Sequence, residues 1–361
     1  MFTLPEYRKP DFEYARFLAC PDCRFVPAPK DGVCPPDYHA NSIFPEYFKV
    51  DGKWYLGEDS RMDAVPVWNG KGIDIVEPRK LKKGDLVAVG RTENGEEGIY
   101  VNYEPFAAKE GKDNTFAFRT GRTRETSFTK DYKELIELLR YEKENNGYVV
   151  WVLGPACSFD IEARRIMAKL IEEGYCQALL SGNALATHDL EAAYFGTALG
   201  CDIETQKVQY MGHYNHLDLI NTVKLHGSIK KFVEEERISD GIIASCVRND
   251  VPFVLTSSVR DDGPLPEVYA NSYEGQNAYR DHVRRATTVI GMATMLHTIA
   301  TGNMTPSFRV LSDKTIRPVY FYMVDSAEFV ANKLQDRGSL SSKGIVTNVQ
   351  DFLKNLERGL F

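Results

Sequence analysis

The chain has 361 residues, of which 43% are hydrophobic and 26% charged; this is the composition of a folded globular protein and excludes disordered and fibrous classes. Its formal net charge of −7 argues against a surface that binds nucleic acid or an anionic membrane. No apolar run approaches the roughly 18 residues needed to span a bilayer, and the N-terminus lacks the apolar block of a signal peptide. With seven cysteines, an odd number, these features predict a cytoplasmic protein with mostly free thiols.

Residues 1–118 are expected to form a small, mainly antiparallel β-domain. Glycine and proline recur every few residues, and short apolar runs such as KWYLGED and LVAVG are separated by Asp-Gly, Asn-Gly and Lys-Gly turns. Turns of this kind connect antiparallel strands. No long helical periodicity interrupts the pattern.

Four residues of this β-domain could ligate zinc. They are Cys20, Cys23, Cys34 and His39. A Cys-x-x-Cys pair can share one zinc ion, and a third cysteine and a histidine could complete a tetrahedron. The second half of the set is spaced more widely than in zinc knuckles, so plain loop cysteines are the alternative interpretation. A redox pair fits less well, because that motif normally opens a helix in a βαβ unit.

Residues 119–147 are interpreted as a linker followed by a helix. The charged stretch carries Arg119, Arg122 and Arg124, a basic cluster that could meet a carboxylate or phosphate, although its composition is that of a solvated linker. The helical pattern begins after Thr129, which is placed to cap it.

Residues 148–361 alternate between strand and helix patterns. The first unit, YVVWVLGPACSFD, is an unbroken apolar run that ends in a Gly-Pro-Ala turn and leads at once into a helical pattern. A buried parallel strand followed by a crossover helix has this appearance. Repeated units of this kind predict a mostly parallel sheet with helices on both faces. The fold class is therefore α/β, with the smaller β-domain preceding the parallel-sheet domain.

Polar and small residues follow the predicted strands, at the edge where open parallel sheets bind ligands. They occur in the segments 154–158, 181–189, 256–267 and 292–303, and at Asp325. Backbone N–H groups at the helix starts could approach a phosphate, and Asp325 could accept hydrogen bonds from a ribose diol. The first turn lacks the three-glycine dinucleotide fingerprint, and Asp325 could equally be part of a helix cap.

Candidate acid–base residues fall in the same half of the chain. His297 follows a strand end, where a general acid or base can meet a substrate. The adjacent Asp261 and Asp262 could hold a substrate ammonium or raise one another's pKa; a solvated acidic turn is the alternative. His213 and His216 could share a helical face, but no carboxylate or third histidine lies at a recognised metal-ligand spacing, so no metal is predicted there.

Longer segments carry a family resemblance. In order, they are SGNALATHDLEAAYFGTALG, GHYNHLDLINTV, VPFVLTSSVRDDGPLPE and MLHTIATGNM. They resemble the archaeal-type ornithine cyclodeaminases, a domain that also forms the C-terminal part of cyanobacterial bifunctional arginine dihydrolase/ornithine cyclodeaminases. The segments NSIFPEYFKVDGKW and RMDAVPV resemble the conserved region named after lysine-oxoglutarate reductase/saccharopine dehydrogenase.

The resemblance implies a Rossmann-like domain that binds NAD and converts L-ornithine to L-proline with release of ammonia. In this chemistry a hydride leaves the α-carbon, the δ-amine closes the ring on the resulting imine, ammonia leaves, and the hydride returns. By position, we assign Asp261 or Asp262 to the amine end of the substrate, His216 or His297 to proton transfer, and Arg260 to the substrate carboxylate. The expected cofactor contacts are Gly154, Pro155, Ala156, Gly182, Asn183, Ala184, Met292, Ala293, Thr294 and Asp325.

Two other functions remain open at this point. An NAD-dependent oxidoreductase acting on another amino acid or a cyclic imine would consume or produce NADH stoichiometrically. A non-catalytic protein that senses NAD or an amino acid would bind its ligand without turnover. In each case the partner is a small molecule, and a homo-oligomer is expected only because many soluble enzymes are symmetric oligomers.

Overall fold

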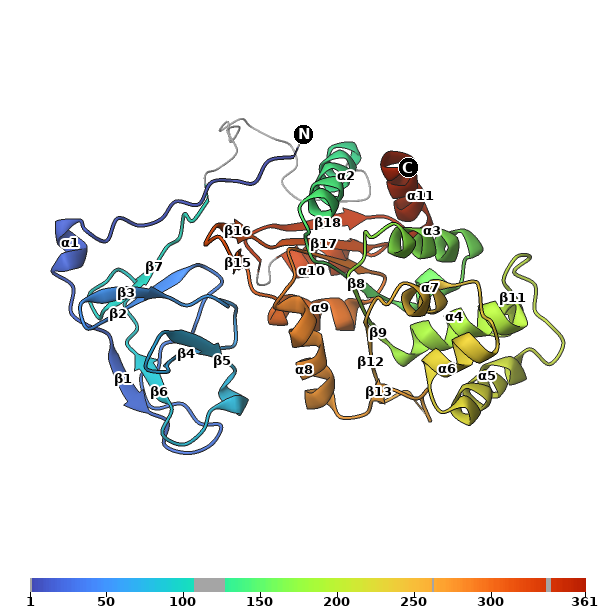
Figure 1. Cartoon of the computed structure of the whole chain (residues 1–361), viewed down its shortest axis with the longest axis horizontal. Coiled ribbons are helices and arrows are strands. Elements are labelled where there is room, and N and C mark those ends of the chain that lie inside the picture. Colours follow the sequence, from blue (N-terminus) through green and yellow to red (C-terminus); the bar gives the residue numbers. More distant parts are fainter. Residues whose placement is uncertain (1, 107–126, 262, 336–338) are drawn as a thin grey trace.

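The computed structural model describes residues 2–106, 127–261, 263–335 and 339–361. Two parts lie side by side in Figure 1: an N-terminal β region, residues 2–106, drawn in blue and cyan, and a parallel-sheet region, residues 127–361, drawn from green to red. The basic cluster expected in the linker lies outside the described residues.

The N-terminal β region contains two small antiparallel sheets, with strand orders β1-β6-β4-β5 and β3-β2-β7. Its elements are α1 (Ala15–Leu18), β1 (Arg24–Pro27), β2 (Glu46–Val50), β3 (Lys53–Leu56), β4 (Val65–Trp68), β5 (Ile73–Val76), η1 (Pro78–Lys80), β6 (Leu86–Val89) and β7 (Ile99–Val101). Buried Phe48, Ile75 and Ile99 belong to its main apolar cluster. The expected antiparallel character of this region is confirmed.

The parallel-sheet region is built on seven parallel strands in the order β13-β12-β9-β8-β14-β17-β18. The strands are β8 (Val149–Leu153), β9 (Ala178–Gly182), β12 (Phe253–Thr256), β13 (Val268–Tyr269), β14 (Thr288–Met292), β17 (Tyr320–Asp325) and β18 (Ser342–Val346). Leaving out the short edge strand β13, their order along the sheet is third, second, first, fourth, fifth and sixth, which is the Rossmann order. The predicted α/β, mostly parallel fold is confirmed.

Helices cover both faces of this sheet (Figure 1). The helices are α2 (Thr129–Glu144), η2 (Pro155–Ser158), α3 (Ile161–Glu172), α4 (Asn183–Phe195), α5 (His213–His226), α6 (Ile229–Glu235), α7 (Ile242–Arg248), α8 (Ser272–Val283), α9 (Met295–Met304), α10 (Glu328–Gln335) and α11 (Val349–Leu360). Apolar residues of α2 to α7 and α11 pack on one face, and those of α8 to α10 on the other. None of the helices in the described part of the chain combines the length and apolar character that crossing a bilayer needs.

The central strand β8 explains why the apolar run folds in this way. All five of its residues are buried, and successive side chains enter the two opposite cores: Trp151 packs in one, Val150 and Val152 in the other. Full burial of each large apolar side chain is worth about 1.5–3 kcal/mol. The indole Nε1 of Trp151 donates a hydrogen bond to the carbonyl oxygen of Tyr175 at 2.9 Å, so its polar atom is also satisfied.

Several short elements are absent from the sequence-based prediction. They are the hairpin strands β10 (Thr197–Ala198) and β11 (Cys201–Asp202), the edge strand β13, the helix α7, and the hairpin strands β15 (Phe308–Val310) and β16 (Ile316–Pro318). Helix α7 has no local side-chain cap; its first N–H groups are accepted by the carboxylate of Asp189, more than 50 residues away. Thr129 is the first residue of α2 rather than its cap.

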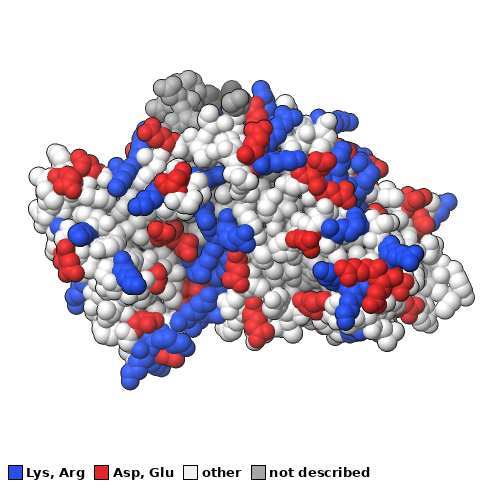
Figure 2. Space-filling model, viewed as in Figure 1, with Lys and Arg blue, Asp and Glu red and all other residues white. Residues whose placement is uncertain are grey.

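An ionic cluster joins the two regions. Glu77 accepts Nη2 of Arg61 at 2.6 Å, and lies 2.5 Å from Nε of Arg280 on α8 and 3.2 Å from Nζ of Lys80. In Figure 2, Lys and Arg side chains gather in the middle of the face, where the two regions meet. Because Glu77 is 5% exposed, this contact is shielded from solvent and fixes α8 against the N-terminal β region.

Candidate functional site

The turns that follow β8, β14 and β17 are hydrogen-bonded to one another. The N–H of Gly154 donates to the carbonyl oxygen of Met292 at 2.9 Å, and the N–H of Ala293 donates to that of Val324 at 3.0 Å. A Cβ atom on Gly154 would lie 1.9 Å from the carbonyl oxygen of Ala293, so only glycine fits there. This close approach lies between β8 and β14, where the strand order reverses and Rossmann folds bind dinucleotides.

Two helices begin at this edge without a side-chain cap. They are α4, whose N-cap is Gly182, and α9, whose N-cap is Thr294. By contrast, Asp160 and Asn348 cap α3 and α11 with their side chains. Uncapped N–H groups at a helix start donate readily to an anion, and the helix dipole favours its negative charge.

Two of the expected cofactor residues use their side chains to hold the protein chain. Oδ1 of Asn183 accepts the N–H of Leu265 at 3.0 Å, which ties the loop after β12 to α4. Oδ1 of Asp325 accepts the N–H of Ala327 at 2.8 Å, as in a turn that opens a helix. The side chain of Asp325 therefore forms a turn just before α10, which begins at Glu328. A ribose contact through its other oxygen stays a prediction.

His297 lies at the start of α9 with a defined ring orientation. Tyr279 donates its hydroxyl proton to the carbonyl oxygen of Ser181 at 2.8 Å, so the phenolic oxygen is left to accept from Nδ1 of His297 at 3.0 Å. This arrangement places the proton on Nδ1 and leaves the lone pair on Nε2. That Nε2 atom lies 3.1 Å from where a Cβ of Gly182 would be. Burial lowers the pKa of His297, and the carboxylate of Asp261 raises it in opposition.

The acidic loop after β12 approaches the same edge. Asp261 accepts the N–H of Ser258 at 2.7 Å and is half-buried, whereas Arg260 is exposed. The charge of Asp261 acts on His297, so these two predicted residues lie near each other in the fold. Asp262 lies outside the described residues.

A large cavity, of about 1380 Å³, lies away from the strand ends. Its walls come from the N-terminal arm, strands β3 and β5, Arg284 and the β15–β16 hairpin, and include Tyr47 and Trp54. None of the strand-end residues predicted to contact a cofactor lines it. The candidate site is the group of polar residues at the strand ends and not this cavity, because the strand-end group includes a histidine whose ring orientation is fixed by hydrogen bonds.

The predicted zinc set is not supported. The thiol of Cys20 donates to the carbonyl oxygen of Arg16, and Nε2 of His39 lies 2.9 Å from the carboxylate of Glu46, to which it is hydrogen-bonded. Burial raises the pKa of the Cys23 thiol to about 12, which disfavours the thiolate that zinc needs. Within the described residues, Cys20, Cys23, Cys34 and His39 do not form a ligand group; the Cys-x-x-Cys spacing belongs to a loop.

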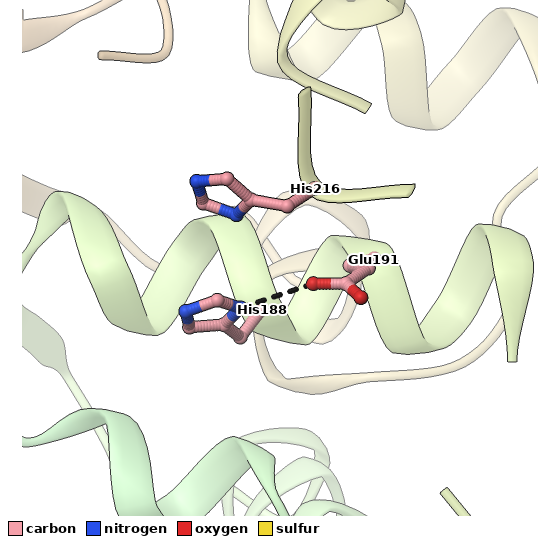
Figure 3. A group of neighbouring side chains, drawn as sticks. All are labelled: His188, Glu191 and His216. Atoms are coloured by element: carbon pink, nitrogen blue, oxygen red, sulfur yellow. Dashed lines mark hydrogen bonds and ion pairs between the residues drawn. The ribbon is translucent and has the colours of Figure 1, made fainter. Parts of the chain in front are cut away.

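A different group of possible metal ligands is formed by His188, Glu191 and His216 (Figure 3), whose ligand atoms lie within 4.8 Å of one another. The first two come from α4 and the third from α5. His216 stacks on His188 of α4 and lies beside Glu191, so it belongs to this group rather than to the surroundings of His297. Sequence reasoning missed the group because its members come from two helices. The i, i+3 spacing of His188 and Glu191 was the available signal, since such residues share a helix face.

Comparison with known proteins decides the family. A family model described as "Arginine dihydrolase ArgZ-like, C-terminal, Rossmann fold" matches residues 133–356, more than half of the chain. The ornithine cyclodeaminase of Methanopyrus kandleri is 40% identical over 344 residues, which cover 94% of this chain and 78% of that protein. The chain belongs to the ArgZ-like C-terminal family. The resemblance seen in the sequence is confirmed.

Solved structures related to this ArgZ-like chain share its fold. The crystal structure of a conserved LOR/SDH protein from Methanococcus maripaludis S2 has a TM-score of 0.85 at 34% identity and covers 94% of this chain and 98% of that one. AgrE, solved in a ternary complex with ornithine and NAD+, has a TM-score of 0.59 at 34% identity. This match covers 95% of the ArgZ-like chain but 46% of AgrE, so the chain spans about half of that protein.

Proposed function

We propose that this protein is an NAD-dependent ornithine cyclodeaminase, which converts L-ornithine to L-proline and ammonia. The observation that carries the proposal is His297, whose unprotonated Nε2 faces Gly182 at the carboxyl edge of a Rossmann sheet. Relatives that align with most of the chain are named ornithine cyclodeaminase, and AgrE has been solved with ornithine and NAD+ bound together.

The strand-end turns have the features that NAD needs. The uncapped starts of α4 and α9 would donate N–H groups to the pyrophosphate, and the missing side chain of Gly154 lets the turns after β8 and β14 meet at this edge. The carboxylate of Asp325 would accept hydrogen bonds from a ribose. When bound, NAD would supply the oxidising centre, taking a hydride from the α-carbon and returning it after ring closure, so that the reaction has no net oxidation.

His297 would act as the general base. Because burial lowers its pKa, the ring is neutral at pH 7, and Nε2 can accept a proton from a substrate ammonium. The hydrogen bond from Nδ1 to Tyr279 fixes the direction of Nε2 and is backed by the bond from Tyr279 to Ser181. His216, the other candidate, is assigned elsewhere because its contacts are with His188 and Glu191.

Asp261 would hold the amine end of the substrate, at a position close enough to His297 to influence its charge. A carboxylate there favours a cationic δ-ammonium before the base removes its proton. Arg260, exposed on the same loop, would meet the substrate carboxylate as a bidentate partner. Asp262 remains the alternative to Asp261 for the amine.

The test is turnover by the purified protein with L-ornithine and NAD+. We expect proline and ammonia in equal amounts, with no accumulation of NADH. His297→Asn should lower kcat at least 100-fold, the usual contribution of a general base, and leave the Kd for NAD+ unchanged.

A matched control is His282→Asn. His282 is also half-buried and its Nδ1 is hydrogen-bonded to a tyrosine, Tyr148, at 2.8 Å, but it lies near the amino ends of the strands. This variant should keep its activity. Stoichiometric NADH formation would instead identify a net oxidoreductase, and NAD+ binding without turnover a sensing protein; either outcome rejects the proposal.

A further inference from the structure

We propose that His188, Glu191 and His216 form a divalent-cation site that joins α4 to α5, with Zn²⁺ as its best-fitting ion. The site is separate from the strand-end group to which the proposed NAD chemistry belongs. It is built from two imidazole nitrogens and one carboxylate oxygen (Figure 3), the donor types that zinc accepts in three-ligand sites.

The charge balance of this group is the first observation in its favour. Glu191 is fully buried, and among the described residues no lysine or arginine pairs with it. Its Oε2 atom lies 3.0 Å from Nδ1 of His188, which is 6% exposed. An isolated buried carboxylate is costly unless a positive charge or strong hydrogen bonds accompany it. A cation among the three side chains would supply that charge.

The second observation is an unsatisfied atom. Nδ1 of His216 is buried and has no hydrogen-bond partner among the described residues. In Figure 3, the ring of His216 lies over the ring of His188, with Glu191 beside them, and the two imidazoles are stacked with centroids 5.1 Å apart. This buried nitrogen without a partner is therefore available as a ligand.

The carboxylate is held in place by the residues behind it. Oε1 of Glu191 accepts the hydroxyl of Thr197 at 2.9 Å, and this hydroxyl oxygen accepts Nδ2 of Asn215 at 2.9 Å. Hydrogen bonds of this kind orient the ligands of a metal site. Oε2 is therefore presented to His188 and His216 while Oε1 is fixed, as a ligating carboxylate requires.

Ion binding replaces one contact and forms three. The proton on Nδ1 of His188 is exchanged through solvent for one on Nε2, so the ring stays neutral, and the hydrogen bond to Glu191 gives way to bonds from both residues to the ion. His216 on α5 then becomes a ligand together with two residues of α4, the helix that begins at Asn183 in the candidate site. The cation would thereby link α4 to α5 and stabilise the position of α4. On the other side, Phe159, which follows η2, packs against the ring of His188.

The experiment uses the full chain, stripped with a chelator under reducing conditions and titrated with Zn²⁺ against a competing indicator. We expect one strong site per chain and a rise in Tm with Zn²⁺, since an ion that binds the folded state stabilises it. Glu191→Gln, which keeps an acceptor for Thr197, and His216→Ala should each weaken binding at least about tenfold and remove the rise in Tm.

His213→Ala is the matched control. His213 lies on the same helix, one turn before His216, but is exposed, so its loss should leave binding unchanged. Cys20→Ser with Cys23→Ser separates this site from thiol-bound zinc and should also leave it unchanged. The proposal is overturned if the wild-type chain binds no Zn²⁺, if His216→Ala binds as tightly as wild type, or if the cysteine variants lose the site.

Discussion

At the scale of single residues, the surroundings of a histidine distinguish one role from another. His297, His282 and His216 are all half-buried, and burial lowers the pKa of each. They differ in what the ring nitrogens meet. His297 has one nitrogen fixed by Tyr279 and the other directed at Gly182, whereas His216 has a buried nitrogen that meets no partner among the described residues.

We predict that Asp261→Asn lowers the pKa of His297 further. Burial already holds this pKa below its usual value of 6.5, and the charge of Asp261 is the influence that raises it. A base is active only when deprotonated, so kcat/KM should fall as the pH drops through the lowered pKa, and the variant should retain the base form to lower pH. NMR titration of the His297 ring measures the shift without depending on activity.

Asp74→Asn provides the comparison for this titration, because Asp74 is exposed on a distant strand, β5. It should leave the His297 pKa where it is in the wild type. If the pKa of His297 were unchanged or raised in Asp261→Asn, the charge of Asp261 would not act on His297 and the prediction would be wrong.

At the scale of elements, the contact between the turns after β8 and β14 is the tightest part of the site. Gly154→Ala would place a Cβ 1.9 Å from the carbonyl oxygen of Ala293 and 2.6 Å from its carbonyl carbon, both backbone atoms that cannot turn away. We expect a loss of roughly 3 kcal/mol in the free energy of unfolding, the upper part of the range for overpacking, together with weaker NAD+ binding. Chemical denaturation and an NAD+ titration measure the two effects.

Gly72→Ala is the corresponding harmless change. A Cβ there meets nothing within 4 Å, and its backbone conformation is open to any residue. Stability should change by no more than about 0.5 kcal/mol. Equal stability of the two variants would mean that the β8 and β14 turns can separate without cost.

Most of the parallel sheet could be predicted from the sequence because its strands are buried on both faces. The run around Trp151 and the run from Val289 to Met292 contain no polar side chain, and helices capped by Ser228 and Asn348 carry their own start signals. The elements that escaped prediction lack such local signals. Strand β13 has two residues, and α7 depends on the distant Asp189 for its first hydrogen bonds.

The candidate site was predictable only in part, for the same reason. Strand ends meet at one edge whatever their sequence, so His297 and Gly182 could be placed together from topology alone. Whether a polar side chain binds a ligand or makes a structural hydrogen bond depends on residues that are distant in the sequence. Asn183 holds Leu265, and His39 holds Glu46, and neither contact leaves a trace in local spacing.

At the scale of the whole molecule, Glu77 couples the two regions. Burial would raise the pKa of its carboxyl group, but the charges of Arg61 and Arg280 outweigh this effect and lower the pKa to about 2. A carboxyl whose pKa is lowered by folding stabilises the protein above its unfolded value, near 4.5, and loses this contribution as the pH falls towards 2.

We therefore predict that Glu77→Gln destabilises the protein by roughly 3 kcal/mol at pH 7, because it leaves buried guanidinium groups without their partner. The same variant should lose less stability than wild type between pH 5 and pH 2. Urea denaturation across this range provides the measurement. Asp31→Asn, which removes an exposed pair with Lys82, should have little effect at pH 7; a comparable loss there would assign the effect of Glu77 to surface charge in general.

The three tryptophans of the chain are divided between the regions in a useful way. Trp151 sits in the middle of the parallel sheet, fully shielded and hydrogen-bonded to Tyr175, whereas Trp54 stacks on Phe12 and Trp68 packs against Tyr55 in the N-terminal region. With phenylalanine at positions 54 and 68, the remaining indole becomes a single fluorophore at the centre of the parallel sheet. Its emission then reports the unfolding of the parallel-sheet region alone, so the unfolding of the two regions can be measured separately.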